Sequence, residues 1–432
     1  MKNQPAYDFD FAVAGGGPGG ASAAISLAQR GHRVVLFESE TFPRFHIGES
    51  LLSTVNDAFV ALGVAETIET AGFPAKWGAR LLTHDGSSGR DVDFAASGEV
   101  RRPQTWQVCR GEFDRILLDR AREVGVDVRE ACRATGCEFG PDAATVEVAP
   151  SQGEPARVRV RALVDATGRH GLVARKLGLR IDEPRLANIA IYSHYRGVPR
   201  LEGNRPNDIR LIARSDAGWF WLIPISDHLT SVGVVLPRRL FLAMPSGSNE
   251  ERLERAIADT PAVADLMRNA TREWPVRAEK DFSYSSAAYA GNRWILVGDA
   301  GSFLDPVFST GVSIAMESGI EAAAELDRCL ARGDFSAAMF TAFSRRQRRR
   351  FELFRRYVIG FYTPEFRDRF FTPNPPAWIF RSVVTVLAGN WDPSLWTRFL
   401  GHVFFASVAI QKQLPRGKTR FRRDSAAGYP EG

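Results

Sequence analysis

Short apolar runs typical of buried strands alternate with stretches of helical periodicity in several parts of the chain. Near the N-terminus, residues 9–14 predict a strand, 21–30 a helix and 34–37 a second strand. Residues 108–128 predict a helix that leads into a strand, and residues 293–319 a strand, a loop and a helix. Strands and helices that alternate in this way predict an α/β fold.

Two other segments have a different pattern. Residues 73–105 and 181–275 are rich in strand-forming residues, which predicts a second sheet. From residue 346 onward the pattern is helical and unusually aromatic. We find no internal repeat and no low-complexity run.

The first predicted strand and helix are joined by a glycine-rich turn. Gly15, Gly17 and Gly20 form the pattern Gly-x-Gly-x-x-Gly, and Glu38 stands at the end of the next predicted strand. Residues without side chains let the backbone approach a pyrophosphate, and the start of the helix offers it free N–H groups. An acidic residue at this spacing meets a ribose hydroxyl. The order of these elements predicts a dinucleotide-binding fold.

Two later stretches indicate which dinucleotide is bound. The segment "RALVDATGRHGLVARKLG" (161–178) and the segment "RWILVGDAGSFLDPVFSTGVSIAMESG" (293–319) resemble the FAD-dependent aromatic hydroxylase superfamily. This resemblance implies FAD as the cofactor, with Asp299 at the ribityl chain and Arg110 in contact with the flavin. It also places Arg44, Ile47 and Pro306 at the cofactor.

Three further motifs are similar to those of the flavin-dependent halogenases. They are "FPRFHIGESLL" (42–52), Phe73-x-x-Lys76-x-Gly78, and Trp219-Phe220-Trp221-Leu222-Ile223-Pro224. The resemblance covers the chain from about residue 8 to at least residue 345. Seen alone, Lys76 between aromatic residues fits a lysine whose stem lies along apolar surface. The resemblance instead identifies it as the essential lysine of the family, held in a dry cavity.

The resemblance also implies a reaction. A separate reductase supplies reduced FAD, which reacts with oxygen and with chloride or bromide to give hypohalous acid. Thr310 and Gly311 match the halide site, at a predicted helix start that favours an anion. Hypohalous acid then reaches Lys76, which either hydrogen-bonds it or forms a chloramine. Trp219 and Trp221 are expected to wall the region between flavin and substrate, and Ser50 to lie in the substrate pocket.

One position departs from the tryptophan halogenases of the family. They carry a glutamate immediately before Ser-Thr-Gly, where this chain has Phe308. A substrate without that acid must be electron-rich, which favours a phenol or a pyrrole, either free or tethered to an acyl or peptidyl carrier protein. The alternative is that Phe308 packs against the flavin loop and another acid serves.

The hydroxylase-like plan implies an FAD-binding, Rossmann-like domain interrupted by a β-rich substrate domain. The C-terminal helices either close the substrate cavity or expose a docking surface. The expected ranges are 1–72, 106–180 and 276–345 for the FAD-binding domain, 73–105 and 181–275 for the substrate-domain sheet, and 346–432 for the helical C-terminal segment.

Composition restricts the remaining possibilities. The chain has 432 residues, 44% of them hydrophobic and 25% charged, as in ordinary globular enzymes. The four cysteines form no CxxC pair and the seven histidines no close cluster, so no metal site is expected. The N-terminus does not resemble a secretory signal, and the longest uncharged stretches are too short to cross a bilayer. A cytoplasmic enzyme is therefore expected.

The net charge of +6 is unevenly distributed. Seven arginines fall within residues 345–356, interleaved with aromatic residues in a predicted helix. Because the overall charge is modest and no nucleic-acid motif accompanies it, we do not expect nucleic-acid binding. The helix is either a solvated face or a docking surface for an acidic partner such as a carrier protein.

Three rival functions share these features. An aromatic hydroxylase of the same fold would insert oxygen directly and would not need Lys76. A flavin reductase of isoprenoid double bonds shares the N-terminal layout. A flavin-binding interaction protein without turnover could use the arginine helix to bind its partner. The mass of the product with and without halide separates these alternatives.

Overall fold

The computed structural model describes residues 7–371 and 376–413. The first of its two structural units is built around a six-stranded sheet in which all neighbouring strands are parallel except the β18–β19 pair. The strands in spatial order are β18 (Ala290–Gly291), β19 (Trp294–Leu296), β11 (Ala162–Asp165), β1 (Phe11–Ala14), β2 (Val34–Phe37) and β7 (Asp127–Arg129). The predicted α/β class is confirmed, although β1 begins two residues later than the sequence pattern indicates.

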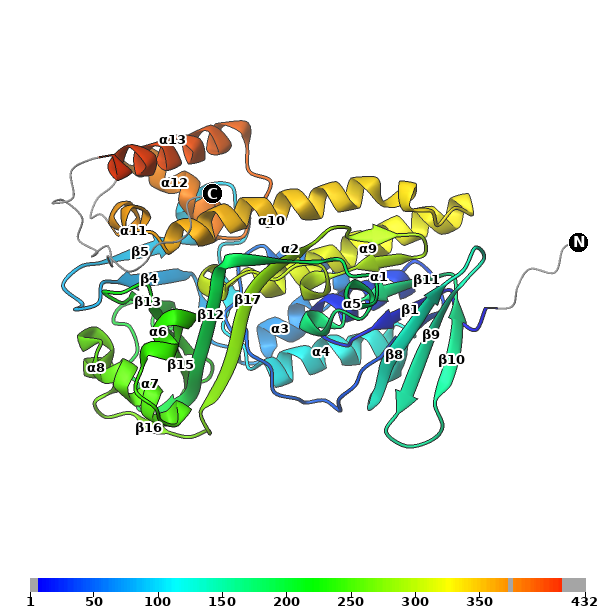
Figure 1. Ribbon diagram of the computed structural model, residues 1–432, viewed down its shortest axis with the longest axis horizontal. Helices are drawn as coiled ribbons and strands as arrows, with labels where there is room; N and C mark the ends of the chain where they lie inside the picture. The colour runs from blue at the N-terminus through cyan, green and yellow to red at the C-terminus, as the bar shows by residue number, and fades with distance from the viewer. Residues whose placement is uncertain (1–6, 372–375, 414–432) are drawn as a thin grey trace, which may run out of the picture.

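Both faces of this sheet are covered, which explains why its strands are apolar without alternation. Phe11, Val13 and Leu36 contribute to one core and Ala12 and Val35 to another. Helices cover the first face and a three-stranded sheet covers the second (Figure 1). The helices are α1 (Pro18–Ala28), α2 (Val55–Leu62), α3 (Ala65–Thr70), α4 (Arg110–Glu123) and α9 (Gly311–Arg332); the strands are β8 (Cys132–Phe139), β9 (Ala144–Pro150) and β10 (Ala156–Val160).

An eight-stranded sheet forms the second unit. Most of its strands come from the segments expected to be strand-rich. They are β16 (Thr271–Arg272), β12 (Arg180–Arg196), β15 (Thr230–Pro237), β14 (Trp219–Pro224), β13 (Ile209–Ala213), β4 (Gly78–Leu82) and β5 (Gly89–Asp93), with β17 (Arg277–Ser286) paired to β12. β17 lies in the range expected for the FAD-binding domain, so the sheet extends past the expected division at 276.

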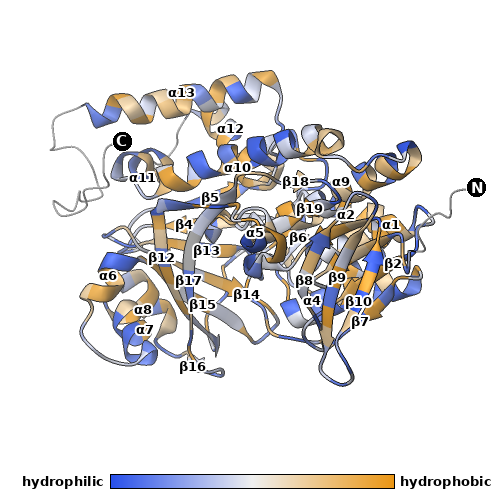
Figure 2. Ribbon diagram, turned by 45° about the vertical axis from the view of Figure 1, so that its right-hand side comes forward, coloured by the Kyte–Doolittle hydropathy of each residue, from blue (hydrophilic) through white to orange (hydrophobic). Residues whose placement is uncertain are grey.

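The two faces of this sheet also bury different sets of side chains. Trp219, Trp221 and Ile223 point to one core, whereas Phe220 and Leu222 point to the other. Three short helices cover the second core and the C-terminal helices cover the first (Figures 1 and 2). The helices over the second core are α6 (Arg238–Ala243), α7 (Asn249–Ala258) and α8 (Pro261–Met267). The C-terminal helices over the first core are α10 (Thr341–Phe361), α11 (Pro364–Phe370), α12 (Ala377–Leu387) and α13 (Leu395–Lys412). Nowhere in 7–371 or 376–413 is a helix long and apolar enough to cross a membrane.

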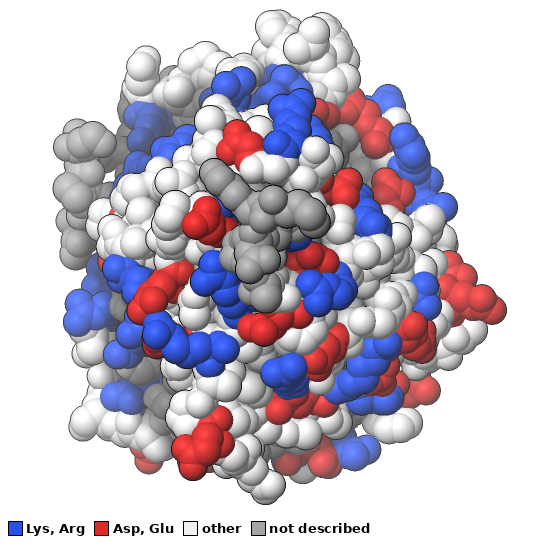
Figure 3. Space-filling view, turned by 90° about the vertical axis from the view of Figure 1, so that its right-hand side faces the viewer, with Lys and Arg blue, Asp and Glu red and all other residues white. Residues whose placement is uncertain are grey.

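Part of the arginine run on α10 is turned inward. Arg350 is 1% exposed, donates to Glu321 at 2.7 Å and lies 3.2 Å from Glu317. Arg355 donates to Glu183 at 2.6 Å. Neither a wholly solvated face nor a wholly exposed docking surface therefore describes this helix. Basic and acidic side chains are also interspersed on the molecular face in Figure 3.

Arg350 joins α10 to α9, and its removal is expected to destabilise the fold. Arg350→Ala leaves Glu317 without the cation beside it and Glu321 with Arg346 alone, and it removes a guanidinium that lies 4.2 Å from the ring centroid of Trp391. Because the loss of one partner strands the other charges, we expect a loss of about 2 kcal/mol in unfolding free energy. Urea denaturation measures it. Arg345→Ala on the exposed face is the control, and equal midpoints for both variants would contradict the prediction.

Candidate functional site

The glycine turn has the geometry that a bound dinucleotide requires. Gly15 has a φ of +102°, and a Cβ there would lie 2.3 Å from the Ala166 carbonyl oxygen. A Cβ at Gly20 would lie 1.9 Å from the Gly15 carbonyl oxygen. At Gly17 the nearest atom to an added methyl group would be Nη2 of Arg44, at 3.5 Å. Gly15 and Gly20 are thus needed for packing, whereas Gly17 leaves an open approach to the start of α1.

Glu38 lies beside this turn at the end of β2. Its side chain is buried, and its carboxylate accepts hydrogen bonds from the backbone N–H groups of Gly16 at 2.7 Å and Glu40 at 2.9 Å. These contacts fix the carboxylate next to the glycine turn. The turn, the helix start and this acid therefore fit the pyrophosphate and ribose of FAD.

Arg44, Ile47 and Arg110 are all predicted to contact the cofactor, and hydrogen bonds link them through Arg110 and Asp114. Arg110 donates to both carboxylate oxygens of Asp114 at 2.8 Å and to the Ile47 carbonyl oxygen at 2.7 Å. Arg44 donates to Asp114 at 3.3 Å. Burial, with the charge of Arg110, lowers the pKa of the neighbouring His46 to about 4. Sequence reasoning missed Asp114, although its spacing of four residues from Arg110 on one helix was an available signal.

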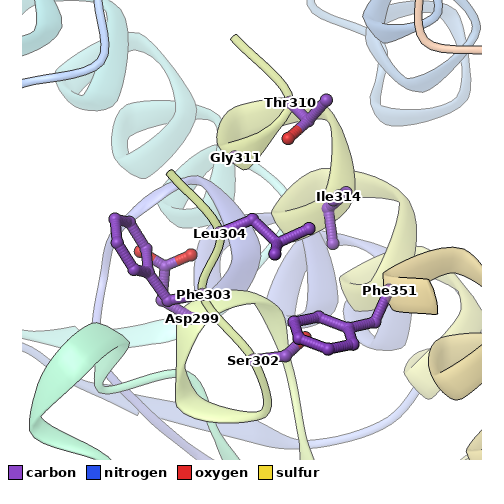
Figure 4. Close-up of a pocket in the computed structure, with 8 residues that line it drawn as sticks. All are labelled: Asp299, Ser302, Phe303, Leu304, Thr310, Gly311, Ile314 and Phe351. Carbon is purple, nitrogen blue, oxygen red and sulfur yellow. The ribbon is translucent and has the colours of Figure 1, made fainter. Parts of the chain in front are cut away.

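A small pocket brings the predicted cofactor residue Asp299 together with the predicted halide residues Thr310 and Gly311 (Figure 4). It has about 10 Å³ of free volume, the scale of one water molecule or a small ion. Burial raises the pKa of the Asp299 carboxyl to about 6, although Arg169 and Arg110 act in the opposite direction. The other lining residues are Ser302, Phe303, Leu304, Ile314 and Phe351.

Thr310 and Gly311 stand at the first turn of α9. Thr310 is the N-cap residue and Gly311 the first helical residue, and no side chain among the described residues caps this end. The first N–H groups of a helix lack partners within the helix and carry partial positive charge. Ser309, just before them, has a φ of 56°, which turns the chain sharply into the helix. This end of α9 therefore suits a halide.

The loop before α9 is held by a buried hydrogen-bond network centred on Asp305, next to the predicted cofactor residue Pro306. Asp305 accepts from Asn188 at 2.7 Å and from the Tyr362 hydroxyl at 2.6 Å. Tyr362 in turn accepts from the indole N–H of Trp219 at 2.8 Å. The network joins the halide loop to β12, β14 and the end of α10. Sequence reasoning missed it, because its members are far apart in the chain.

Lys76 lies in β3 (Ala75–Lys76), a two-residue strand paired with β6 (Thr105–Trp106). It is 1% exposed, and its amine donates to Ser50 Oγ at 2.8 Å and to the Leu51 carbonyl oxygen at 2.7 Å. The ring of Phe94 lies 5.2 Å from the amine. Burial lowers the pKa of Lys76 to about 7. The structure therefore favours a buried lysine over one that extends to water, while its catalytic role stays a prediction.

Aromatic side chains surround the position that distinguishes this chain from the tryptophan halogenases. Phe308 packs edge-on against Phe361, with ring centroids 5.8 Å apart, and against Phe370 at 6.2 Å. The rings of Trp219 and Trp221 lie 5.9 Å apart in the same core. The C-terminal helices α10 and α11 thus supply apolar surface beside Phe308.

Comparisons with known proteins identify the relatives of this chain. The chain matches the family model described as Tryptophan halogenase over residues 10–92 and 90–372. The 1H-pyrrole-2-carbonyl-(peptidyl-carrier protein) chlorinase of Pseudomonas fluorescens is 32% identical over 357 residues, which cover 78% of this chain and 79% of that protein. The tryptophan 2-halogenase of Chondromyces crocatus is 37% identical over 77% of this chain and 64% of its own length. The solved flavin-dependent brominase Bmp2 has a TM-score of 0.79 and 28% identity, and the match covers 94% of this chain and 100% of Bmp2.

Proposed function

The chain belongs to the tryptophan halogenase family of flavin-dependent halogenases, and we propose that it halogenates an electron-rich arene, a phenol or a pyrrole, with Lys76 as the catalytic group. Family membership confirms the flavin-dependent halogenase predicted from the motifs, with FAD as the cofactor and a halide as a reactant. It favours this function over the hydroxylase and the non-catalytic flavin protein. The role of each residue below is part of the proposal.

When bound, reduced FAD supplies the chemistry by which oxygen and a halide give hypohalous acid. The chain's own contribution is to place these components. The glycine turn and Glu38 bind the dinucleotide, and Arg110 holds the segment that carries Ile47. Thr310 and Gly311 bind chloride or bromide at the start of α9. A separate flavin reductase is proposed as the source of reduced FAD.

Lys76 receives the hypohalous acid, and its burial is the observation that carries the proposal. With a pKa of about 7, the side chain is present near neutral pH both as an ammonium and as a neutral amine. The ammonium donates a hydrogen bond to the oxygen of hypohalous acid. The neutral amine instead takes the halogen, and the N–H proton leaves with hydroxide as water. Apolar neighbours such as Phe94 exclude the bulk water that would otherwise compete.

The substrate is inferred from the missing acid. Because Phe308 stands where tryptophan halogenases have glutamate, the arene must supply its own electron density, as a phenol or a pyrrole does. The chlorinase of Pseudomonas fluorescens is named for a pyrrole on a peptidyl carrier protein. We therefore propose either a free arene or a carrier-tethered one. The exposed arginines of α10, among them Arg345, Arg348 and Arg349, are proposed to face an acidic carrier, although Arg348 also donates to the Ala287 carbonyl oxygen and Arg349 lies 3.5 Å from Asp392.

The experiment that tests this function supplies reduced FAD from an unrelated reductase. Purified protein, NADH, oxygen and bromide or chloride are incubated with a free phenol and with a pyrrole on a carrier protein. We expect halogenated product, identified by its mass and isotope pattern, only when both halide and reductase are present. A product that gains oxygen without halide would indicate a hydroxylase, and coupled NADPH consumption by the isolated chain would contradict the two-component scheme.

A further inference from the structure

The backbone that follows Lys76 is held by a carboxylate from a distant part of the chain. Asp208, immediately before β13, accepts hydrogen bonds through Oδ1 from the N–H groups of Trp77 at 2.6 Å and Gly78 at 3.0 Å. Asp208 is 5% exposed. A buried carboxylate that accepts two backbone N–H groups forms strong, directional bonds. The two peptide units after Lys76 are therefore fixed by this one side chain.

The surrounding sheet keeps Asp208 in register with the lysine segment. Strands β13 and β4 are parallel neighbours, with Ile209 opposite Ala79. The backbone at Gly78 packs closely against β5 and leaves no room for a side chain, because a Cβ there would lie 1.8 Å from the Val92 carbonyl oxygen. Asp208 and the segment around Lys76 are thus packed together at the adjacent starts of β13 and β4 in the eight-stranded sheet.

Asp208 also supplies the charge that acts on the buried amine. Burial lowers the pKa of Lys76 and the negative charge of Asp208 raises it. Burial raises the pKa of Asp208, while the backbone N–H of Trp77 and the charge of Lys76 lower it. Two other charged groups lie nearby. Arg205 is paired with Asp93 at 2.8 Å, and its charge also lowers the pKa of Asp208, while Glu49 is paired with His194 at 2.6 Å.

We propose that Asp208 is a positioning residue that holds Lys76 in place and sets how much of its amine is protonated during halogenation. The inference rests on the proposed role of Lys76 and assigns a carboxylate to the segment of Lys76, in a chain that has Phe308 where tryptophan halogenases have a glutamate. Asp208 acts through Lys76. Its charge retains the proton on part of the lysine population, so that ammonium and amine coexist near neutral pH.

Asp208→Asn separates the charge from the geometry. The asparagine amide oxygen still accepts the N–H groups of Trp77 and Gly78, while the negative charge is lost. Without that charge, the ammonium form of Lys76 is less favoured, and its pKa falls. We expect a decrease of about one unit, the lower end of the range found for an opposite charge near a titrating group.

Nuclear magnetic resonance measures this shift without turnover. The chain has six lysines, Lys2, Lys76, Lys176, Lys280, Lys412 and Lys418. Protein labelled with ¹³C at lysine Cε gives one signal per lysine, and Lys76→Met identifies the signal of interest. Asp91→Asn is the control, because Asp91 is exposed, lies in the same sheet and bonds Arg80. It is expected to leave the Lys76 titration unchanged.

The pH profile of halogenation gives the second measurement. The part of the activity–pH curve that follows the titration of Lys76 is expected to shift to lower pH in Asp208→Asn. The shift should equal the decrease in the Lys76 pKa measured by nuclear magnetic resonance, whether the ammonium or the amine is the reactive form. An unchanged Lys76 pKa in a folded Asp208→Asn protein would overturn the proposal, as would a lowered pKa with an unchanged profile. If the parent protein forms no halogenated product, the proposed function fails, and the resonance titration still decides whether Asp208 controls Lys76.

Discussion

Replacing Lys76 with methionine is expected to abolish halogenated product while FAD remains bound. Methionine keeps an unbranched side chain of similar length, so the change removes the amine without opening a large cavity. The glycine turn and Glu38, which we propose to hold the dinucleotide, form none of the hydrogen bonds of the Lys76 amine, which go to Ser50 and Leu51. Loss of a group that transfers or polarises the reacting atom costs about three orders of magnitude in rate. Product is measured by mass spectrometry and FAD binding by fluorescence titration.

Arginine at this position tests whether charge alone is sufficient. Lys76→Arg keeps a cation but places a larger planar group where one amine donates to Ser50 and Leu51, and the guanidinium cannot take up halogen as a neutral amine does. We expect it to be inactive too. Near-parental halogenation by Lys76→Met would exclude a catalytic role, and loss of FAD binding together with folding would make Lys76 a structural residue.

The parts of the site that the sequence predicts are those whose chemistry depends on neighbours in the chain. Gly15, Gly17 and Gly20 are recognisable because a strand, a turn and a helix follow one another within a few residues. Thr310 and Gly311 are placed at a helix start for the same reason. Local hydrogen bonding and periodicity decide such positions, so the pattern is sufficient to predict them.

The partners of these residues are decided by tertiary packing, which the sequence does not display. Trp77 meets Asp208 across 131 positions, and Tyr362 meets Asp305 across 57. Arg350 lies in a run of arginines whose composition indicates a surface, yet packing of α10 against α9 buries it beside Glu321. In each case the polar group can be buried because a residue of another helix, strand or loop supplies its hydrogen-bond or ion-pair partner. No periodicity marks such a pair.

Replacing Gly17 with alanine is expected to weaken FAD binding about a hundredfold, or about 2.7 kcal/mol, without unfolding the protein. Gly17 is extended, with a φ of −67°, and an added methyl group would come no closer than 3.5 Å to another group, so the apoprotein accommodates alanine. The methyl group would instead stand where the backbone approaches the pyrophosphate at the start of α1.

Gly20→Ala is the matched comparison, because its Cβ would lie 1.9 Å from the Gly15 carbonyl oxygen and the turn itself must shift. We expect Gly20→Ala to lose both thermal stability and FAD affinity, whereas Gly17→Ala loses affinity alone. Fluorescence titration with FAD gives the dissociation constants, and melting of the FAD-free proteins gives the stabilities. Parental FAD affinity in Gly17→Ala would mean that the pyrophosphate does not approach the chain at Gly17, and that the open start of α1 serves another purpose.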